Sequence, residues 1–301
     1  MAVIKMGSSD TAMIKLIQKV VGVKPDGIFG IKTMKAVILW QRDNNLVADG
    51  YGGPKTMDAM DLIDTDLKNK SQFLTEDGLL INKHYLPKGE YVEEDYKINN
   101  DYAFLHFTAG WENPYRTIDS WGRDERGRVA TEFVLGGQNH KTGNDKYDGV
   151  MVQAFPEGCQ GFHLGPTGSR YMARHSVGLE IWCIGYLTKD NKSYINSTAK
   201  YPEQVCVLEK PFRKHTRWHK LSDKQLDATK KWILYVANRD NIDIDRGLID
   251  WIKKEGPHKA FEFHEDAYKG KVKGLLTHAN VRKDKYDLFP QPELIDMLLS
   301  I

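Results

Sequence analysis

The chain has 301 residues, of which 41% are hydrophobic and 28% are charged. This composition is typical of a folded globular protein and excludes a disordered or collagen-like chain. The formal net charge is only +2, whereas nucleic-acid binding usually requires a strongly basic surface, so no nucleic-acid partner is predicted. Single hydrophobic cores usually stop growing below this chain length, which predicts two domains.

The cysteines and the N-terminal residues indicate the cellular compartment in which the protein is made. Cys159, Cys183 and Cys206 are widely spaced and form no CxxC pair, so neither a disulfide framework nor a cysteine-rich zinc site is predicted. The first residues, MAVIKMGSSD, lack the apolar stretch of a secretion signal, and no apolar run approaches about 18 residues. We therefore expect a protein that is made in the cytoplasm without a signal peptide and does not insert into membranes. Separately, we expect a monomer.

The first sixty residues contain an internal repeat. DGIFGIKTMKAV starts at Asp26 and DGYGGPKTMDAM starts at Asp49, and the copies agree at Asp, Gly, Gly, Lys, Thr, Met and Ala. Each Asp-Gly pair predicts a turn, and Thr33 and Thr56 are predicted to cap the helices that follow. With an amphipathic helix upstream, the pattern predicts a compact three-helix bundle over residues 1–65.

Residues 1–65 resemble the peptidoglycan-binding domain type 1 family. The resemblance rests on DGIFG, AVxxxQ, Asn45-Leu46 and DGxxGPKT, which occur in that order over nearly the whole module. It implies that the module binds bacterial peptidoglycan, through the peptide stem, in a shallow groove.

A polar, charged stretch over residues 66–76 predicts a linker, followed by a second domain over residues 77–301. The apolar run 102–107 is typical of a buried strand and places His106 at its carboxyl end, the edge of an open sheet where ligands gather. A histidine there is also compatible with a hydrogen-bonded core residue. For this domain we expect the α+β or α/β class, with a central mixed β-sheet flanked by helices.

Residues 185–217 are long and irregular, which predicts an insertion or a lid over a cleft with a role in substrate selection. His215 and His219 are four residues apart and could present two ligands on a helix face. The stronger interpretation is that they begin the helix that follows. Ser222, with Gln225 three residues later, forms a predicted capping box for that helix.

The stretch THANVRKDKYDLFP, residues 277–290, is the strongest candidate for chemistry. It sets His278, Lys285 and Asp287 within ten residues. Imidazole and carboxylate groups are ligands that Zn²⁺ accepts, and a nearby lysine could meet developing negative charge. Taken alone, the stretch lacks at least one further ligand and is also compatible with a charged surface loop.

Five motifs of the second domain resemble, in order, the zinc-dependent N-acetylmuramoyl-L-alanine amidase type 2 family. They are HFTAG at 106–110, TEFVLGG at 131–137, FHLG at 162–165, HSVGLEI at 175–181 and the H-x6-K-x-D run that starts at His278. The resemblance spans roughly residue 80 to the C-terminus. It implies a peptidoglycan hydrolase that cleaves the amide bond between N-acetylmuramic acid and L-alanine.

The resemblance also implies roles for individual residues. His106, His278 and Asp287 would bind the zinc ion, with the fourth position open to water. Glu180, in the motif Ser-Val-Gly-Leu-Glu, would be the general base that takes a proton from the attacking water. Lys285 would stabilise the oxyanion of the tetrahedral intermediate.

Three further residues are expected to contact the substrate. His163 matches the W-H-x-G position of the family, with a role in the core or in fixing a tautomer as its alternative. Thr108 belongs to the first motif. Some family members carry a tyrosine where this chain reads Thr131-Glu132-Phe133, so Glu132 is a rival to Glu180 for the role of general base.

Two other functions stay open at this point. A zinc-dependent stem-peptide endopeptidase would need S-x-H-x6-D and E-x-x-W-H motifs, which the chain does not match. A non-catalytic peptidoglycan recognition protein would lack a metal ligand, whereas all three positions are filled. We therefore expect an amidase of the phage endolysin type, which acts on the cell wall after release from the cytoplasm.

Overall fold

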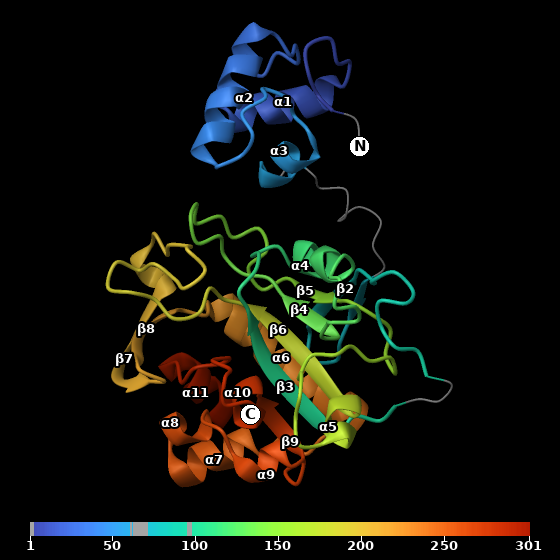
Figure 1. Ribbon diagram of the computed structural model, residues 1–301, viewed down its shortest axis with the longest axis vertical. Helices are drawn as coiled ribbons and strands as arrows, with labels where there is room; N and C mark the ends of the chain where they lie inside the picture. The colour runs from blue at the N-terminus through green and yellow to red at the C-terminus, as the bar shows by residue number, and fades with distance from the viewer. Residues whose placement is uncertain (1–2, 61, 63–71, 95–97) are drawn as a thin grey trace. The chain divides into compact units, whose positions relative to one another are not determined.

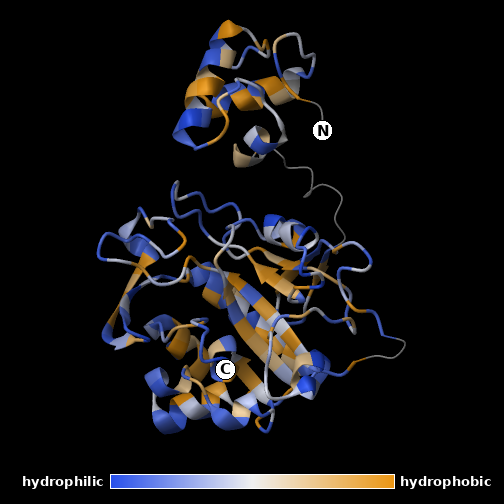
Figure 2. Cartoon of the chain, viewed as in Figure 1, coloured by the Kyte–Doolittle hydropathy of each residue, from blue (hydrophilic) through white to orange (hydrophobic). Residues whose placement is uncertain are grey.

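The computed structural model describes residues 3–60, 62, 72–94 and 98–301 (Figure 1). The chain divides into two compact units, residues 1–70 and 71–301, and each unit has a hydrophobic core. Figure 2 shows hydrophobic residues along the central strands and hydrophilic residues on the outer loops. None of the described helices is long and apolar enough to cross a membrane.

The described part of the first unit is a bundle of α1 (Thr11–Val20), α2 (Ile31–Asp43) and α3 (Pro54–Ala59), as the repeat predicts. Asp10 caps α1 by accepting a hydrogen bond from the Met13 N–H at 3.0 Å. The helices enclose a small apolar core that consists of Ile4, Ile14, Ile17, Phe29, Val37, Met57 and Met60.

The sequence repeat is also a repeat of hydrogen bonds. The Gln18 side-chain amide donates to Asp26 Oδ1 at 2.7 Å and to Thr33 Oγ1 at 3.1 Å, and its oxygen accepts from the Gly27 N–H at 2.9 Å. The second copy has the same three bonds, at 2.8, 2.9 and 2.9 Å, from Gln41 to Asp49, Thr56 and Gly50. Each buried glutamine thus joins a helix to the turn that follows it.

The prediction that Thr33 and Thr56 are N-caps is wrong. Both residues lie inside helices, α2 and α3, and Gly30 occupies the N-cap position of α2. The Thr33 hydroxyl accepts a hydrogen bond from Gln18, and the Thr56 hydroxyl accepts one from Gln41. A buried amide that lacked this acceptor would lose part of its hydrogen bonding, which explains the use of threonine there.

A seven-stranded mixed sheet forms the centre of the second unit. In spatial order its strands are β1 (Gln72–Leu74), β2 (Leu80–Lys83), β5 (Met151–Gln153), β4 (Phe133–Leu135), β6 (Ser176–Trp182), β3 (Tyr102–Thr108) and β9 (Gly274–Thr277). β3 is parallel to both of its neighbours, β6 and β9, whereas β1–β2 and β4–β5 are antiparallel. The predicted mixed sheet is confirmed.

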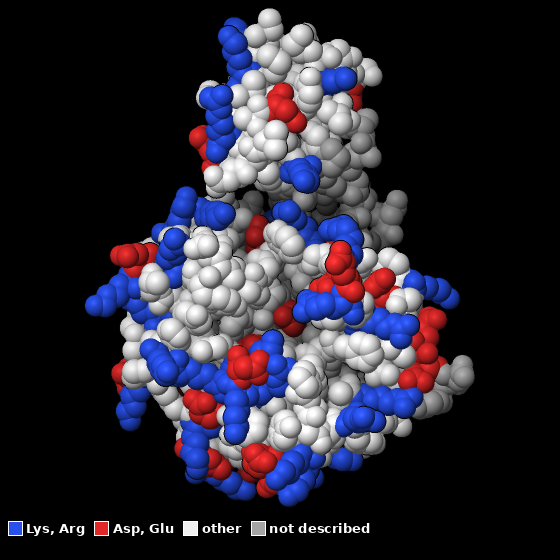
Figure 3. Space-filling view, in the orientation of Figure 1, with Lys and Arg blue, Asp and Glu red and all other residues white. Residues whose placement is uncertain are grey.

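Helices flank this sheet, also as predicted. They are α4 (Pro114–Trp121), α5 (Arg170–Arg174), α6 (Asp223–Asp240), α7 (Leu248–Glu255), α8 (Pro257–Ala260), α9 (Glu265–Tyr268), α10 (His278–Val281) and α11 (Pro292–Leu299). The predicted capping box of α6 is confirmed, because the Ser222 hydroxyl and the Gln225 side chain each bond the other's backbone N–H. On the face seen in Figure 3, Lys and Arg are interspersed with Asp and Glu.

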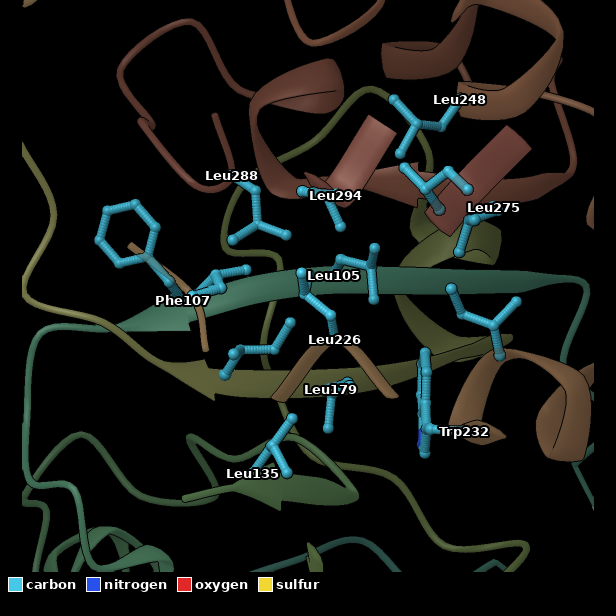
Figure 4. Close-up of a cluster of buried hydrophobic side chains, with 14 of the residues drawn as sticks. Leu105, Phe107, Leu135, Leu179, Leu226, Trp232, Leu248, Leu275, Leu288 and Leu294 are labelled. Carbon is cyan, nitrogen blue, oxygen red and sulfur yellow. The ribbon is translucent and has the colours of Figure 1, made fainter. Parts of the chain in front are cut away.

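The two faces of β3 serve different purposes, because alternate residues of a strand point to opposite sides of a sheet. Leu105 and Phe107 belong to the main core, where Figure 4 shows Leu105 and Leu179 clustered with Trp232 of α6. Tyr102 and Phe104 pack in a separate cluster on the opposite face. His106 continues the line of Tyr102 and Phe104, so it projects from this second face at the carboxyl end of the strand.

The predicted linker, residues 66–76, lies partly outside the described residues, which resume at residue 72. Gln72–Leu74 is strand β1, which pairs with Leu80–Lys83. The sheet therefore begins before residue 77, the predicted start of the second domain, because this short strand finds its partner across a turn.

The prediction that His215 and His219 begin a helix is wrong. After a short 3-10 helix (Pro202–Gln204), β7 (Val205–Phe212) and β8 (His215–His219) form an antiparallel two-stranded sheet. In a strand the two histidines cannot form an i, i+4 pair on a helix face. His219 is 1% exposed, its ring is 4.6 Å from that of Trp182, and neither ring nitrogen has a hydrogen-bond partner among the described residues.

This burial predicts a pH-dependent stability. Burial lowers the pKa of His219 to about 3, whereas the unfolded imidazole takes up a proton near about pH 6.5. The neutral form therefore contributes stability above about pH 6.5, and this contribution is lost as the pH falls toward 3, by about 1.4 kcal/mol per pH unit. In urea unfolding at pH 7 and pH 5, His219→Gln should lose less stability than the wild type.

The control is Thr216→Val, at an exposed position of the same strand, which should keep the wild-type dependence on pH. If His219→Gln and the wild type lost equal free energy of unfolding between pH 7 and pH 5, burial of the neutral His219 would not be the cause of the pH dependence.

Candidate metal centre and active site

Three segments that lie far apart in the sequence bring one ligand atom each to a single point. His106 comes from β3, His278 from the first turn of α10, and Asp287 from the loop after that helix. His106 Nδ1 lies 3.0 Å from His278 Nδ1 and 3.4 Å from Asp287 Oδ2, and His278 Nδ1 lies 3.1 Å from Asp287 Oδ2. These are the three predicted metal ligands, and the structure brings them together.

The geometry of the three atoms fits a metal ion. Ligand distances of about 2.0–2.2 Å in a tetrahedral zinc site place neighbouring ligand atoms about 3.3 Å apart, close to the separations found here. Two imidazoles and one carboxylate also suit zinc chemically. In the described part of the chain, no other group of three histidine, cysteine or acidic residues converges in this way.

Hydrogen bonds on the far side of each imidazole turn Nδ1 toward the shared point. His278 Nε2 lies 3.0 Å from the Leu164 carbonyl oxygen, so Nε2 carries the proton and donates it. His106 Nε2 lies 2.9 Å from His163 Nδ1, and His163 Nε2 lies 2.9 Å from the Ser176 hydroxyl. A chain of bonds from His106 through His163 to Ser176 therefore fixes the tautomer of His106.

The protonation states also suit a metal site. Burial lowers the pKa of His106 to about 4, so its imidazole is neutral near pH 7. Burial alone would raise the pKa of Asp287, but the hydrogen bonds and charges of His106 and His278 hold that pKa well below its ordinary value. A neutral imidazole and an ionised carboxylate are the forms that bind metals.

The start of α10 is held by a buried asparagine that the sequence interpretation missed. Asn280 Oδ1 accepts from the Thr277 N–H at 2.8 Å, and Asn280 Nδ2 donates to the carbonyls of Ala260 and Glu262, each at 2.8 Å. These bonds tie the turn that carries His278 to the segment before α9. Only the position of Asn280 three residues after Thr277 hinted at this role.

A cleft of about 500 Å³ opens beside the three ligands, and Glu180 and Lys285 line it. Glu180 lies in β6 directly opposite His106 in the parallel register. Burial of its carboxyl, together with the negative charge of Asp287, raises the pKa of Glu180 to about 8, against the opposing effect of Lys285. No hydrogen-bond partner of the Lys285 ammonium is found among the described residues, so this cation is free to meet a ligand.

Of the three predicted substrate contacts, His163 lines the cleft, but Thr108 and Glu132 do not. The Thr108 hydroxyl accepts from the Gly110 N–H at 2.8 Å. Glu132 is buried, and its two carboxylate oxygens accept from Arg239 at 2.6 and 3.0 Å. Because this ion pair and a bond from Gln153 at 2.8 Å occupy the carboxylate, Glu132 cannot serve as the rival base.

Three tyrosines that the sequence interpretation did not select line the cleft. Tyr186 and Tyr194 come from the 185–217 segment, and Tyr286 lies between Lys285 and Asp287. The predicted insertion thus reaches the cleft, and its role in substrate selection stays a prediction. The three tyrosines belong to no sequence motif. They reach the cleft only because the 185–217 segment packs against the loop that carries Lys285 and Asp287.

The structural role of Glu132 predicts a loss of stability without a change in chemistry. Glu132→Ala leaves a buried guanidinium with fewer partners, which should destabilise the fold by about 3 kcal/mol in urea unfolding. Folded Glu132→Gln should keep the zinc affinity of the wild type. A Glu132→Ala variant as stable as the wild type would contradict this role.

The hydrogen-bond chain behind His106 predicts that His163 supports metal binding. His163→Phe removes the acceptor for the His106 Nε2–H, so zinc affinity should fall about 10-fold to 100-fold in competition with a chromogenic chelator. His163→Gln, which keeps an acceptor, should lose less. Equal affinities in His163→Phe and the wild type would show that the bond does not orient His106.

Comparison with known proteins places the N-terminal module in a family. Residues 14–60 match the family described as "Putative peptidoglycan binding domain". No curated protein sequence matches the chain significantly.

A comparison with solved structures finds several matches at low sequence identity. An AmpD derivative has 12% identity and a TM-score of 0.39, and the match covers 75% of this chain and 99% of AmpD. The endolysin amidase LysCS from Clostridium intestinale has 14% identity and a TM-score of 0.38, covering 72% of this chain and 94% of LysCS. The amidase AmiD from E. coli has 14% identity and a TM-score of 0.37, covering 68% of this chain and 60% of AmiD. The family match shows that the N-terminal part of the chain carries a peptidoglycan-binding domain, as its resemblance to that family implies.

Proposed function

We propose that the protein is a zinc-dependent N-acetylmuramoyl-L-alanine amidase, which cleaves the amide bond between N-acetylmuramic acid and L-alanine in bacterial peptidoglycan. The observation that carries the proposal is the convergence of His106 Nδ1, His278 Nδ1 and Asp287 Oδ2 at the edge of a cleft. Glu180 and Lys285 line the same cleft. The peptidoglycan-binding domain supports the choice of substrate.

The residues of the cleft have separate roles in amide hydrolysis. A bound zinc ion supplies Lewis acidity, which polarises a carbonyl and acidifies a water molecule. Glu180 lines the cleft beside the three ligands, so its ionised form can take a proton from the attacking water. Because burial raises its pKa, the protonated carboxyl then holds that proton long enough to deliver it to the leaving amine. The Lys285 ammonium stabilises the negative charge that develops on the carbonyl oxygen.

The arrangement favours a catalyst over a non-catalytic recognition protein. A binding module needs no third metal ligand and no carboxyl group with a raised pKa, whereas this cleft combines both features. As part of the same proposal, we assign the protein to the phage endolysin type. It would be made in the cytoplasm and act on the cell wall after release, with the N-terminal domain holding it on the polymer.

A digest of purified peptidoglycan tests the proposal. The protein should release L-alanine amino termini without new reducing ends, and a chelator should abolish the activity until zinc is restored. New reducing ends would indicate cleavage of the glycan, and activity that survives removal of the metal would exclude zinc chemistry.

Substitutions in the cleft test the two assigned roles. Glu180→Gln should lower kcat about 10²-fold to 10⁴-fold because it removes the proton acceptor. Lys285→Met should lower kcat about 10²-fold to 10³-fold because it removes the charge that meets the oxyanion. Zinc content, measured by atomic absorption, should stay at the wild-type level in both variants. Glu132→Gln is the matched control and should keep its kcat.

A further inference from the structure

The β7–β8 hairpin packs against the loop that carries Lys285 and Asp287 (Figure 1). The ring of Trp218 in β8 stacks on Phe289 at 4.8 Å, with an angle of 12° between the planes. The ring of His215, also in β8, lies 6.1 Å from that of Tyr286. The aromatic side chains of the hairpin therefore contact both sides of Asp287 along the chain.

At the tip of the hairpin, Arg213 reaches the backbone of this loop. Arg213 and Lys214 have φ angles of 46° and 72°, in the left-handed region that L-residues rarely adopt. The Arg213 side chain is 10% exposed. Its Nη1 donates to the carbonyl oxygen of Lys283 at 3.2 Å and to that of Lys285.

An acidic residue of another segment holds the guanidinium in place. Arg213 Nε donates to Glu262 Oε2 at 3.2 Å. The Glu262 carbonyl in turn accepts from Asn280, the residue that secures the turn of His278. The guanidinium thus lies between the segment that anchors α10 and the loop that follows it.

These contacts bear on the two functional side chains of the loop. Few other backbone bonds hold this part of the chain: the Lys285 N–H donates to Arg282 at 3.3 Å, and the Asp287 carbonyl accepts from Ala279 at 3.0 Å. Arg213 binds the carbonyl of Lys285 itself, so it constrains where the lysine side chain begins. A planar guanidinium can bond two carbonyls and a carboxylate together, which a lysine ammonium on a flexible stem does less well.

We propose that Arg213 is a positioning residue for the reaction: it holds the 283–287 loop so that Lys285 meets the developing charge and Asp287 meets the metal. This inference rests on the proposed amidase function. The β7–β8 hairpin would then support the 283–287 loop, in addition to the predicted role of the 185–217 segment as a lid.

The test uses the full chain with Arg213→Met and Arg213→Lys. Lys210→Met is the control, an exposed position on the same hairpin. On a soluble peptidoglycan fragment, kcat of Arg213→Met should fall at least about tenfold, with KM within about threefold of the wild type. Arg213→Lys should fall between Arg213→Met and the wild type, and Lys210→Met should match the wild type. Unchanged kcat in folded Arg213→Met would overturn the proposal.

A double-mutant cycle separates positioning from general damage to the fold. If Arg213 acts through Lys285, Arg213→Met should cost much less in kcat when Lys285 is already methionine. Losses that multiply fully in the double variant would overturn the proposal. Should Arg213→Met fail to fold, Arg213→Lys takes its place in the cycle with the same two outcomes.

Zinc affinity gives a readout that does not depend on activity. Arg213→Met should bind zinc about tenfold more weakly in chelator competition, because Asp287 is less well held. If the wild-type protein released no L-alanine amino termini, the proposed function would fail, and this affinity would still decide whether Arg213 orders the loop. Equal zinc affinities in Arg213→Met and the wild type would then overturn the positioning role.

Discussion

The Asp287 carboxylate, buried between two imidazoles, is the constraint on which the candidate site depends. A buried charge is costly unless it is paired and hydrogen-bonded, and Asp287 Oδ2 lies 3.1 Å from His278 Nδ1 and 3.4 Å from His106 Nδ1. Because both imidazoles bond other partners through Nε2, their Nδ1 atoms are held toward the carboxylate. The same arrangement suits a cation, which would compensate the buried charge further.

The central sheet positions the other functional side chains around the Asp287 carboxylate. Parallel pairing of β3 with β6 places Glu180 opposite His106, and parallel pairing of β3 with β9 brings α10 to the same edge. A one-residue shift of the β3–β6 pairing would turn Glu180 to the opposite face, into the hydrophobic core. The tight packing of Leu105 and Leu179 in that core therefore also secures the register of the site.

Glu132 and Glu180 show how the environment decides the role of a carboxyl group. Glu132 directly precedes β4 and Glu180 lies in β6 of the same sheet, and both were candidates for the general base. Glu132 forms an ion pair with Arg239 and does not line the cleft, whereas Glu180 lines the cleft and bonds no positive side chain among the described residues. The ion pair with Arg239 gives Glu132 a structural role in the fold. Glu180 forms no such ion pair among the described residues, so its carboxyl group is able to exchange protons.

The sequence by itself determined the features that depend on local patterns. The repeated Asp-Gly turns predicted the helical repeat, the apolar run predicted the strand of His106, and Ser222 with Gln225 predicted the start of α6. The resemblance of five ordered motifs to the amidase family implied His106, His278 and Asp287 as ligands, although 172 residues separate the two histidines. Tertiary structure alone decided which side chains meet: Glu132 with Arg239, 107 residues apart, and Arg213 with the carbonyl of Lys285, 72 residues apart. It also made β8 a strand where a helix was expected, because β7 supplies its pairing partner. Such contacts depend on which surfaces are buried together, and the spacing of residues along one segment carries no information about them.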